Sequence, residues 1–423
     1  MGKNLDALKE AGDHFTEETL KKIVAADKGI DQGVVEILSW DVETISGKGD
    51  NYLSVVNKVR VESKAKDQVL ETRLIVKSLP RNLFRRKLLR SSEYFGNEIT
   101  FYDKIATKFK SYLSAKEQDH LLCIPRCYAY HLDGENDFIA LEDVTCRGYD
   151  SIPRQSCLSY GECKQFLEAM ARFHGISFAF KDERKEEFDG LSSLLSETFY
   201  RTDVYETSLK LFYDDLFRVA KDALTKEYPG SEGEAVFNAC QPDDLFEKTV
   251  EMCTSPNTET SVISQGDTWA PNFMVRRVES GQPDVLIIDF QIARCASPVL
   301  DVIFFIYQCT DKSVREGCWA VLLDDYYTEL CRTMEVLGAD PDKLYPKDVF
   351  RDEVQKYGLY GLMFALVNIP LSLVSENQVF DLDSIKEEVA DIGDLDSMPN
   401  LEKSEDRRRL ADVILHAVEK GYI

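Results

Sequence analysis

A short block of strand-forming sequence interrupts an otherwise helical stretch of the chain, and this block constrains the fold more than any other feature. Residues 262–264 and 273–275 are rich in β-branched and aromatic side chains, and residues 285–288 form another apolar run after a turn that contains Gly281 and Pro283. We therefore expect a β-hairpin with one loop before it and another after it. Because the hairpin folds back on itself, polar groups in the two loops can be neighbours.

The residues that precede position 144 have a different sequence pattern, which is typical of strands rather than helices. Val-rich segments broken by polar turns predict an antiparallel meander over residues 34–79. One amphipathic helix is expected at 94–108, and two more strands are expected at 124–131 and 138–141. These elements predict a small antiparallel sheet with one main helix.

The remainder of the chain is mainly helical. Helical periodicity is found at residues 163–179, 194–224, 245–253 and 302–423. The most apolar stretch, residues 357–373, is short for a membrane span, so we expect a buried helix that stops near Pro370. The sequence thus predicts an α+β fold with two lobes. A small antiparallel-sheet N-terminal lobe would cover residues 1–144, and a mainly helical C-terminal lobe would cover residues 145–423.

The loop before the expected hairpin contains Asp267 and Asn272. An Asp and an Asn separated by four residues have the catalytic-loop spacing of kinases. Asp289 ends the apolar strand that follows, so its carboxylate should emerge beside the same loop. We predict that Asp267 orients a substrate hydroxyl, and that Asn272 and Asp289 bind Mg²⁺, which prefers oxygen ligands. Each motif taken alone has a simpler interpretation. The spacing of Asp267 and Asn272 often occurs by chance, and Asp289 could be an ordinary carboxylate in a turn after a strand.

A glycine-rich turn lies near the start of the expected sheet. Gly47, Gly49 and Asn51 belong to this turn, and Ser54 lies on the strand that follows. Glycines allow backbone amides to approach a triphosphate closely, so these residues are candidates for nucleotide binding. A third glycine of the phosphate-loop pattern is missing, because Tyr52 occupies its place. A simple hairpin turn is therefore the alternative interpretation.

Lys77 ends an apolar strand from which its side chain can reach the α- and β-phosphates of a nucleotide. A lysine in this role needs a carboxylate to hold it. We expect Glu98 to provide it, because Glu98 lies within the helix predicted to pack on the sheet, and Glu93 is the rival candidate. Ordinary surface charges are the alternative for any single lysine and glutamate.

Composition narrows the class of protein. The formal net charge of −24 argues against nucleic acid and against a polybasic membrane anchor, because both need an excess of Lys and Arg. Eleven cysteines without a Cys-x-x-Cys pair indicate thiols in a reducing compartment. The N-terminal residues lack the apolar core of a signal peptide. We expect a cytoplasmic protein, and the sequence leaves its oligomeric state open.

At these motifs the chain resembles the ecdysteroid kinase-like family, which belongs to the group of choline kinases and aminoglycoside phosphotransferases. The matching segments are residues 47–54, 95–102, 141–144, 171–175, 266–272, 288–291 and 297–301. The resemblance covers nearly the whole chain. It is most specific at the two loops that carry Asp267, Asn272 and Asp289.

The resemblance implies a protein-kinase-like fold with ATP bound between two lobes. It also implies that Glu142 to Val144 form a hinge whose backbone meets the adenine, and that Asp301 steadies the catalytic loop. Asp267 would be the catalytic Asp, and Asn272 and Asp289 would bind Mg²⁺. The expected acceptor is a hydroxylated small molecule, of which ecdysteroids are the type case.

One position departs from the family pattern, because Gln265 stands where the family usually has His. An amide can keep a hydrogen bond to the backbone but carries no charge, so we expect the loop to keep its shape. A catalytically impaired nucleotide-binding pseudokinase with a regulatory or sequestering role is the alternative. A protein kinase is less consistent with the sequence, because Asp289-Phe290-Gln291 replaces the usual Asp-Phe-Gly.

Other residues invite separate hypotheses. His174 is expected to pack in the core rather than to take part in chemistry. A zinc site is a weaker possibility, and its candidate ligands are His120, Cys123, Cys127 and His131. An acceptor pocket should face Asp267, and its candidate aromatic residues are Trp269, Tyr326, Tyr327, Phe364 and Phe380. Plain core packing is the alternative for each of these aromatics.

Overall fold

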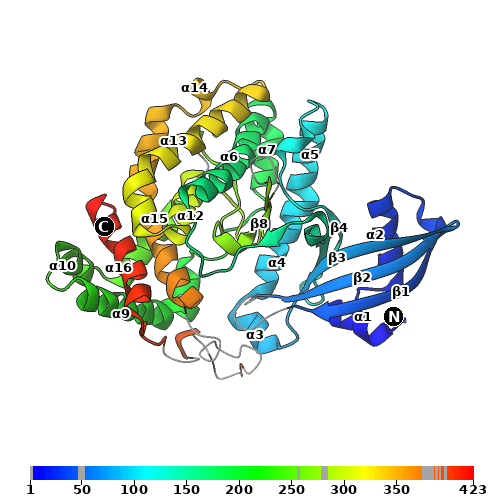
Figure 1. Ribbon diagram of the computed structural model, residues 1–423, viewed down its shortest axis with the longest axis horizontal. Helices are drawn as coiled ribbons and strands as arrows, with labels where there is room; N and C mark the ends of the chain where they lie inside the picture. The colour runs from blue at the N-terminus through cyan, green and yellow to red at the C-terminus, as the bar shows by residue number, and fades with distance from the viewer. Residues whose placement is uncertain are drawn as a thin grey trace.

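A five-stranded antiparallel sheet forms the N-terminal part of the molecule, and helices form most of the rest (Figure 1). The computed structural model describes residues 3–45, 53–254, 258–277, 284–373, 385, 389, 392–394 and 398–423. The strand order is β1-β2-β3-β5-β4. The strands are β1 (Val35–Thr44), β2 (Val55–Ala65), β3 (Gln68–Ser78), β4 (Cys127–His131) and β5 (Phe138–Glu142).

The two faces of this sheet pack against different helices, because successive side chains of a strand point to opposite faces. On β5, Phe138 and Ala140 belong to a hydrophobic cluster with α1 (Leu5–Ala11) and α2 (Glu17–Lys28). Ile139 and Leu141 belong instead to the large core that continues into the helical part. The sheet is therefore buried on one side by the N-terminal helices and joined on the other to the rest of the molecule.

One long helical segment connects the sheet with the helical part. It comprises α4 (Ser91–Thr100), a π-helical turn (Phe101–Ala106) and α5 (Thr107–Ser114). The helix expected at 94–108 is therefore present but longer at both ends. A shorter helix, α3 (Leu83–Leu88), precedes it. In Figure 1 this segment stands between the sheet and the helical bundle.

The helical part surrounds a strand island, as the sequence predicted. Its longer helices are α6 (Tyr160–Glu183), α9 (Lys210–Glu227), α11 (Pro242–Thr254), α12 (Val299–Cys309), α13 (Lys312–Val336), α15 (Lys347–Leu373) and α16 (Ser404–Glu419). The shorter ones are α7 (Lys185–Ser192), α8 (Thr202–Val204), α10 (Glu232–Ala239) and α14 (Pro341–Leu344). The helix expected at 194–224 begins only at Thr202, and a π-helical turn (Tyr205–Leu209) separates α8 from α9 within it.

The strand island forms two small sheets. One has the order β6-β8-β9, and the other pairs β7 with β10. The strands are β6 (Asp150–Ser151), β7 (Val262–Ser264), β8 (Phe273–Arg276), β9 (Asp284–Ile287) and β10 (Arg294–Ala296). Strands β8 and β9 pair in antiparallel register, with Phe273 opposite Ile287, and form the expected hairpin. The predicted α+β architecture is thus confirmed: an antiparallel sheet is followed by a mostly helical remainder.

The buried helix that was expected to stop near Pro370 is present. α15 includes Pro370 and is described up to Leu373, so the helical backbone extends slightly past the proline. Proline removes one backbone donor and clashes with the preceding turn, which bends or ends a helix only if the packing allows it. Pro370 is buried in the last turn of α15, where tertiary packing maintains the helical backbone. No helix among the described residues is both long and apolar enough to span a bilayer.

Close packing of α12 against α15 depends on Gly361. A Cβ atom added there would lie 2.5 Å from Ile303 Cγ2 and 2.8 Å from the Ile303 carbonyl oxygen. We expect Gly361→Ala to lower the free energy of unfolding by about 1–3 kcal/mol, because backbone would have to move. Equilibrium urea denaturation measures the change.

Gly317→Ala is the matched control, since Gly317 lies within α13 and a Cβ there would meet no atom within 4 Å. That substitution should be neutral or stabilising by up to about 1 kcal/mol, because alanine favours helix. Equal stability of the two variants would contradict the packing argument.

Candidate active site

A cavity of about 650 Å³ lies between the sheet and the helical part. Lys77 lines it from β3, and Ser54, expected on the strand, lines it from just before β2. Asp267, Asn272 and Asp289 line it from the two loops beside the hairpin. Its size falls in the range of ordinary ligand pockets, about 300–1,000 Å³. The structure therefore brings residues from distant parts of the sequence to one hollow.

Lys77 reaches this cavity because of its position on β3. Leu74 and Val76 point to the face covered by α1 and α2, so the alternate residue Lys77 points to the opposite face. Its Nζ lies 3.0 and 3.2 Å from the two carboxylate oxygens of Glu98 on α4. It also lies 3.1 Å from Asp289 Oδ1. The ammonium thus joins the sheet, α4 and the loop after the hairpin.

Glu98, rather than Glu93, is the carboxylate next to Lys77. Glu98 is 2% exposed, whereas Glu93 lies outside the cavity and bonds to Arg201 at 2.8 Å. Burial raises the pKa of Glu98 to about 7, although the Lys77 ammonium opposes this shift. Burial acts to lower the pKa of Lys77, but the charges of Asp289 and Glu98 outweigh it and raise the pKa above its usual value. Lys77 therefore stays charged at neutral pH.

The loop that carries Asp267 is shaped by the buried carboxylate of Asp301 on α12. Asp301 accepts hydrogen bonds from the backbone amides of Gln265 at 2.8 Å and Gly266 at 3.0 Å. Gly266 has φ +88°, and a Cβ there would lie 2.1 Å from the Ile292 carbonyl oxygen, so only glycine fits. The expectation that Asp301 steadies this loop agrees with these contacts.

His174 belongs to the same support. Its Nε2 lies 3.2 Å from Asp301, and its Nδ1 lies 2.8 Å from the Tyr326 hydroxyl. Since a carboxylate only accepts, Nε2 donates to Asp301, and in the neutral imidazole Nδ1 then accepts from the Tyr326 hydroxyl. All three side chains are fully or almost fully buried, so His174 has the packed, hydrogen-bonded place expected of it.

Gln265 links the two loops directly. Its amide nitrogen donates to the carbonyl oxygens of Ile288 at 2.9 Å and Asp289 at 2.6 Å. Its amide oxygen accepts from the backbone N–H of Asp267 at 2.8 Å. An uncharged amide can both donate and accept, so it satisfies backbone groups on both sides. The departure from the family pattern therefore leaves the loop well ordered by hydrogen bonds.

Asp267, Asn272 and Asp289 form a compact polar group. Asn272 donates its side-chain N–H to Asp267 Oδ2 at 2.8 Å and to the Asp267 carbonyl at 2.9 Å. Burial raises the pKa of Asp267 to about 7, and the nearby charge of Asp289 adds to this shift. Asp289 adopts a left-handed conformation with φ +63°, an uncommon backbone for a non-glycine residue. The donor set of two carboxylates and one amide oxygen suits a hard cation such as Mg²⁺.

The other residues expected to bind nucleotide have mixed outcomes. Gly47, Gly49 and Asn51 lie outside the described residues. Glu142 and Val144 both line the cavity where β5 ends and a 3₁₀ turn begins. The side chain of Glu142 contacts Arg126 and Arg147 rather than the catalytic loops.

The expected acceptor aromatics divide in the same way. Trp269 and Phe364 line the cavity, whereas Tyr326 and Tyr327 pack in the core, and Phe380 lies outside the described residues. The sequence analysis missed most of the apolar wall, which is formed by Leu88, Leu89, Phe199, Val204, Phe212, Val367 and Leu371. Helical spacing marks these residues as buried but does not distinguish a core from a pocket wall.

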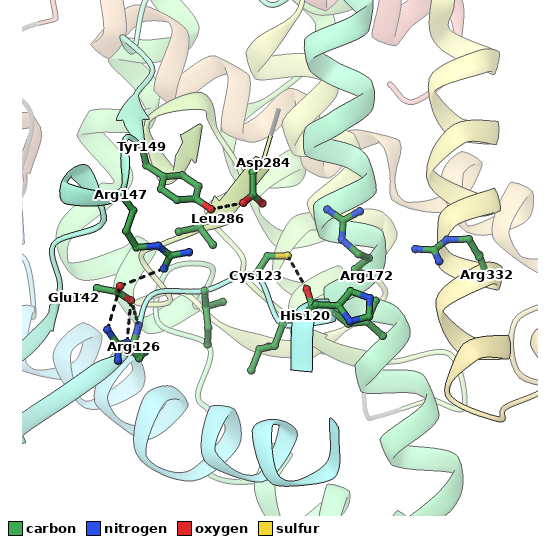
Figure 2. A pocket seen from close by; sticks show the side chains of 13 residues that line it. His120, Cys123, Arg126, Glu142, Arg147, Tyr149, Arg172, Asp284, Leu286 and Arg332 are labelled. Carbon is green, nitrogen blue, oxygen red and sulfur yellow. Dashed lines mark hydrogen bonds and ion pairs between the residues drawn. The ribbon is translucent and has the colours of Figure 1, made fainter. Parts of the chain in front are cut away.

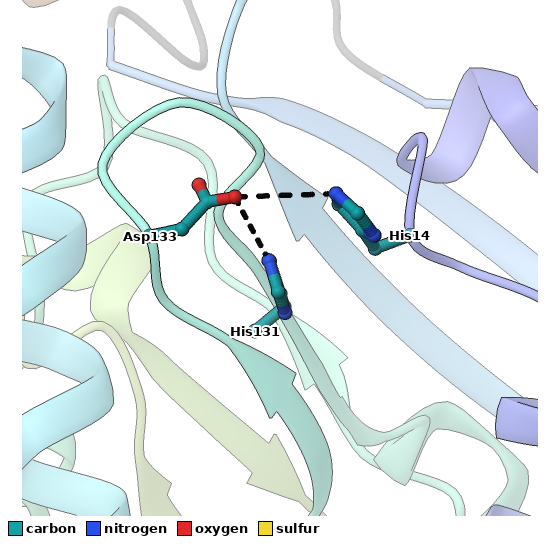
Figure 3. Close-up of side chains that lie close together, drawn as sticks. All are labelled: His14, His131 and Asp133. Atoms are coloured by element: carbon teal, nitrogen blue, oxygen red, sulfur yellow. Dashed lines mark hydrogen bonds and ion pairs between the residues drawn. The ribbon is translucent and has the colours of Figure 1, made fainter.

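The zinc hypothesis is not supported. Within the described part of the chain, one group of three possible metal ligands was found, namely His14, His131 and Asp133. Figure 3 shows both imidazoles directed at one oxygen of Asp133, at 3.9 and 3.0 Å. Cys123, a proposed ligand, instead donates to the His120 carbonyl. The contact in Figure 3 ties the loop after α1 to the β4–β5 hairpin.

Asp301 provides a test of the loop architecture that does not depend on activity. Asp301→Asn leaves one acceptor oxygen for two backbone donors and His174. We expect a loss of about 1–3 kcal/mol in the free energy of unfolding, because a buried donor loses its partner. Chemical denaturation measures this loss.

Asp325→Asn is the control, because Asp325 pairs with Lys164 near the surface. This substitution should lower the free energy of unfolding by less than about 1 kcal/mol. Similar losses in both variants would argue against the support assigned to Asp301.

Comparison with known proteins adds a family to this geometry. The sequence model of the ecdysteroid kinase-like family matches residues 48–339. No curated protein sequence matches the chain. Solved structures similar to it include an ethanolamine kinase of Plasmodium vivax, with 10% identity, 94% of this chain and 86% of that chain covered, and a TM-score of 0.38.

Two further similar structures are a microcompartment-associated aminopropanol kinase and an aminoglycoside phosphotransferase from Streptomyces rimosus. The first has 10% identity, covers 90% of this chain and 93% of that chain, and has a TM-score of 0.40. The second has 15% identity, covers 84% of this chain and 97% of that chain, and has a TM-score of 0.33. Because the family match extends over more than half of its residues, the chain belongs to the ecdysteroid kinase-like family.

Proposed function

We propose that this protein transfers the γ-phosphoryl group of ATP to a hydroxyl of a small molecule. The observation that carries the proposal is the meeting of Lys77, Asp267, Asn272 and Asp289 at one cavity. These residues supply a cation for phosphates, a carboxylate for the hydroxyl and oxygen ligands for Mg²⁺, which are the parts phosphoryl transfer requires. We further propose residues 1–144 as the nucleotide-binding lobe and residues 145–423 as the catalytic and substrate lobe of a cytoplasmic enzyme.

Each residue has a distinct role in this proposal. Lys77, held by Glu98, positions the phosphates. Asn272 and Asp289 hold Mg²⁺, which neutralises charge on the phosphates when bound. Asp267 accepts a hydrogen bond from the attacking hydroxyl and orients it in line with the phosphoryl group. Ser54 and the backbone of Glu142 to Val144 line the nucleotide end of the cavity, and Gly47, Gly49 and Asn51 would complete it.

The acceptor is proposed to be an uncharged, largely apolar alcohol, such as an ecdysteroid or a related polyol. Among the described residues around the cavity, the carboxylates are Glu142, Asp143, Asp267 and Asp289, all at the hinge or the catalytic loops. The remaining wall near Trp269 is mostly aliphatic and aromatic. A cationic amino alcohol would bury its charge there without a partner, which is costly.

A panel of acceptors tests both the reaction and its substrate class. We expect mass spectrometry to detect an added phosphate on steroid polyols and not on amino alcohols or aminoglycosides. Asp267→Asn should lower kcat by about 10²–10⁴-fold, because it removes the base, while ATP binding changes by less than about threefold. Asp325→Asn is the control and should keep full activity.

Three results would count against this assignment. If Asp267→Asn turned over as fast as the wild type, the role proposed for Asp267 would be wrong. If only amino alcohols or aminoglycosides were phosphorylated, the proposal of an apolar acceptor would be wrong. Silence across the panel with intact ATP binding would favour the pseudokinase alternative.

The raised pKa of Asp267 predicts a pH dependence. Asp267 acts as an ionised carboxylate, and its pKa is raised to about 7, so its active form is lost as the pH falls through that value. The pKa of Glu98 lies near the same value, so Glu98 would also be protonated as the pH falls and its ion pair with Lys77 would be lost. We therefore expect kcat/KM for ATP, which reports the free enzyme, to rise with pH and level off above about 7. A profile that is flat between about pH 5.5 and 8.5 would contradict this assignment.

A further inference from the structure

Helix α4 carries Glu98, whereas Lys77 and Asp289 belong to β3 and to the loop after the hairpin. The ion pair between Glu98 and Lys77 therefore depends on where α4 lies relative to these two elements. Its shorter contact is 3.0 Å, and a shift of about 1 Å would take it beyond the normal length of a hydrogen bond, about 2.7–3.2 Å. The groups that fix α4 thus decide whether Lys77 is held in place.

Asn97 of α4 bonds to two other segments of the chain. Its side-chain N–H groups donate to the carbonyl oxygens of Gln291 at 3.1 Å and Ala293 at 2.7 Å, both in the loop after the hairpin. Its amide oxygen accepts from the backbone N–H of Ser196 at 3.2 Å. Asn97 is 4% exposed, so water does not readily replace a bond that is lost. This one amide therefore joins three separate parts of the backbone.

The loop after the hairpin also packs against the end of α4. The rings of Phe101 and Phe290 are stacked with centroids 3.6 Å apart and an interplanar angle of 6°, and both are fully buried. Phe101 directly follows α4, and Phe290 directly follows Asp289. The loop is thus fixed to this helix by packing as well as by hydrogen bonds.

The segment between α7 and α8, residues 196–201, runs along the first two turns of α4. It contacts Arg90, which precedes the helix, and then Glu93, Tyr94 and Asn97. The Tyr94 hydroxyl donates to the Thr198 carbonyl at 3.2 Å, and Arg201 pairs with Glu93 at 2.8 Å. Residues three and four apart lie on one face of a helix, so this face of α4 rests on the α7–α8 segment.

A buried ion pair anchors the α7–α8 segment. The carboxylate of Glu197 lies 2.9 Å from Nε of Arg294 on β10, and the two side chains are 8% and 3% exposed. Arg294 also donates to the Tyr360 hydroxyl at 2.6 Å. Breaking such a pair would leave a buried charge without its partner, which is costly. Because Arg294 follows Ala293, to which Asn97 bonds, the segment and the loop after the hairpin form one fixed support for α4.

We propose that Asn97 is a positioning residue of the active site, which fixes α4 to the loop after the hairpin and to the α7–α8 segment so that Glu98 stays on Lys77. The inference rests on the proposed function and extends it to a residue outside the described lining of the cavity. Asn97 acts through Glu98 and Lys77, and its loss would leave the phosphates of ATP less well placed. The alternative is a purely structural asparagine, whose loss lowers stability and nothing else.

Asn97→Ala is the test variant, and Asn57→Ala is the matched control. Asn57 lies on β2 and is fully buried. Its amide donates to the Glu10 carbonyl at 3.4 Å and accepts from Thr44 at 2.8 Å, so it joins α1 to the sheet on the face away from the cavity. Both substitutions remove a buried amide that connects a helix to another element. We expect both to lower the midpoint of urea denaturation.

The binding of Mg²⁺–ATP, measured by isothermal titration calorimetry, separates the two variants. We expect Asn97→Ala to weaken it by about tenfold or more and to lower kcat/KM for ATP by about 10–100-fold, because a displacement of about 1 Å in a positioning group can cost this much. KM for the acceptor should change by less than about threefold, since the acceptor does not depend on Lys77. Asn57→Ala should keep all three values within about threefold of the wild type.

Glu98→Gln tests whether Asn97 acts through Glu98. Glutamine has nearly the shape of glutamate but cannot form the ion pair with Lys77. The effects of independent sites add, whereas those of coupled residues do not. In the Glu98→Gln background, Asn97→Ala should therefore weaken ATP binding by less than about twofold further.

Two outcomes would overturn the role of Asn97. One is equal ATP affinity in Asn97→Ala and the wild type, and the other is full additivity with Glu98→Gln. If Asn97→Ala does not fold, Asn97→Ser decides. Its hydroxyl has one donor in place of two, so ATP binding should still weaken by about threefold or more, and unchanged affinity would reject the role.

Failure of the proposed function would look different. A wild-type protein that binds Mg²⁺–ATP but phosphorylates no acceptor would contradict the transfer reaction, while the affinity measurements would still decide the role of Asn97. A wild-type protein that does not bind Mg²⁺–ATP would reject the proposed function, and the role of Asn97 would be rejected with it.

Discussion

The position of one ammonium group determines how the two halves of this molecule meet. Lys77 comes from the sheet, Glu98 from α4 and Asp289 from the loop after the hairpin, and all three are in contact. A buried lysine without partners would be costly, so the sheet, α4 and the loop stabilise one arrangement together. Above the raised pKa of Glu98, the two carboxylates around one ammonium also leave the group with excess negative charge. A magnesium ion would compensate for that excess, which is consistent with the proposed chemistry.

The two loops beside the hairpin are held by groups that take no part in the proposed chemistry. The carboxylate of Asp301 accepts hydrogen bonds from two backbone amides of one loop, and the side chain of Gln265 forms hydrogen bonds with both loops. The support is deep in the core, where an unsatisfied polar group is expensive. The backbone of these loops is therefore held by groups other than the polar side chains that face the cavity. This division explains why an uncharged Gln265 is compatible with an ordered loop.

Net charge does not describe the cavities of this protein. The chain is strongly acidic, yet the wall of the active-site cavity around Trp269 and Phe364 is apolar, and another cavity is lined by four arginines together with Glu142 and Asp284 (Figure 2). Surface carboxylates carry this charge at little energetic cost, because water solvates them. Binding sites instead reflect the few groups that the fold withdraws from solvent. Arguments about ligands accordingly depend on local composition rather than on the total.

The sequence alone determined the fold class, the hairpin between two loops, and the pairing of Asp267 with Asn272, because period-two and helical patterns and loop spacing are local properties. The contact between Lys77 and Glu98 was predicted as a preference over Glu93, and the structure agrees with it. Only the tertiary structure decided that α15 continues through Pro370, that Tyr326 packs while Phe364 lines a cavity, and that Glu142 contacts Arg126 and Arg147. The physical reason is that hydrophobic spacing in the sequence predicts which side chains are buried but not which side chains they contact. Contacts between residues far apart in sequence depend on how the helices and strands pack together.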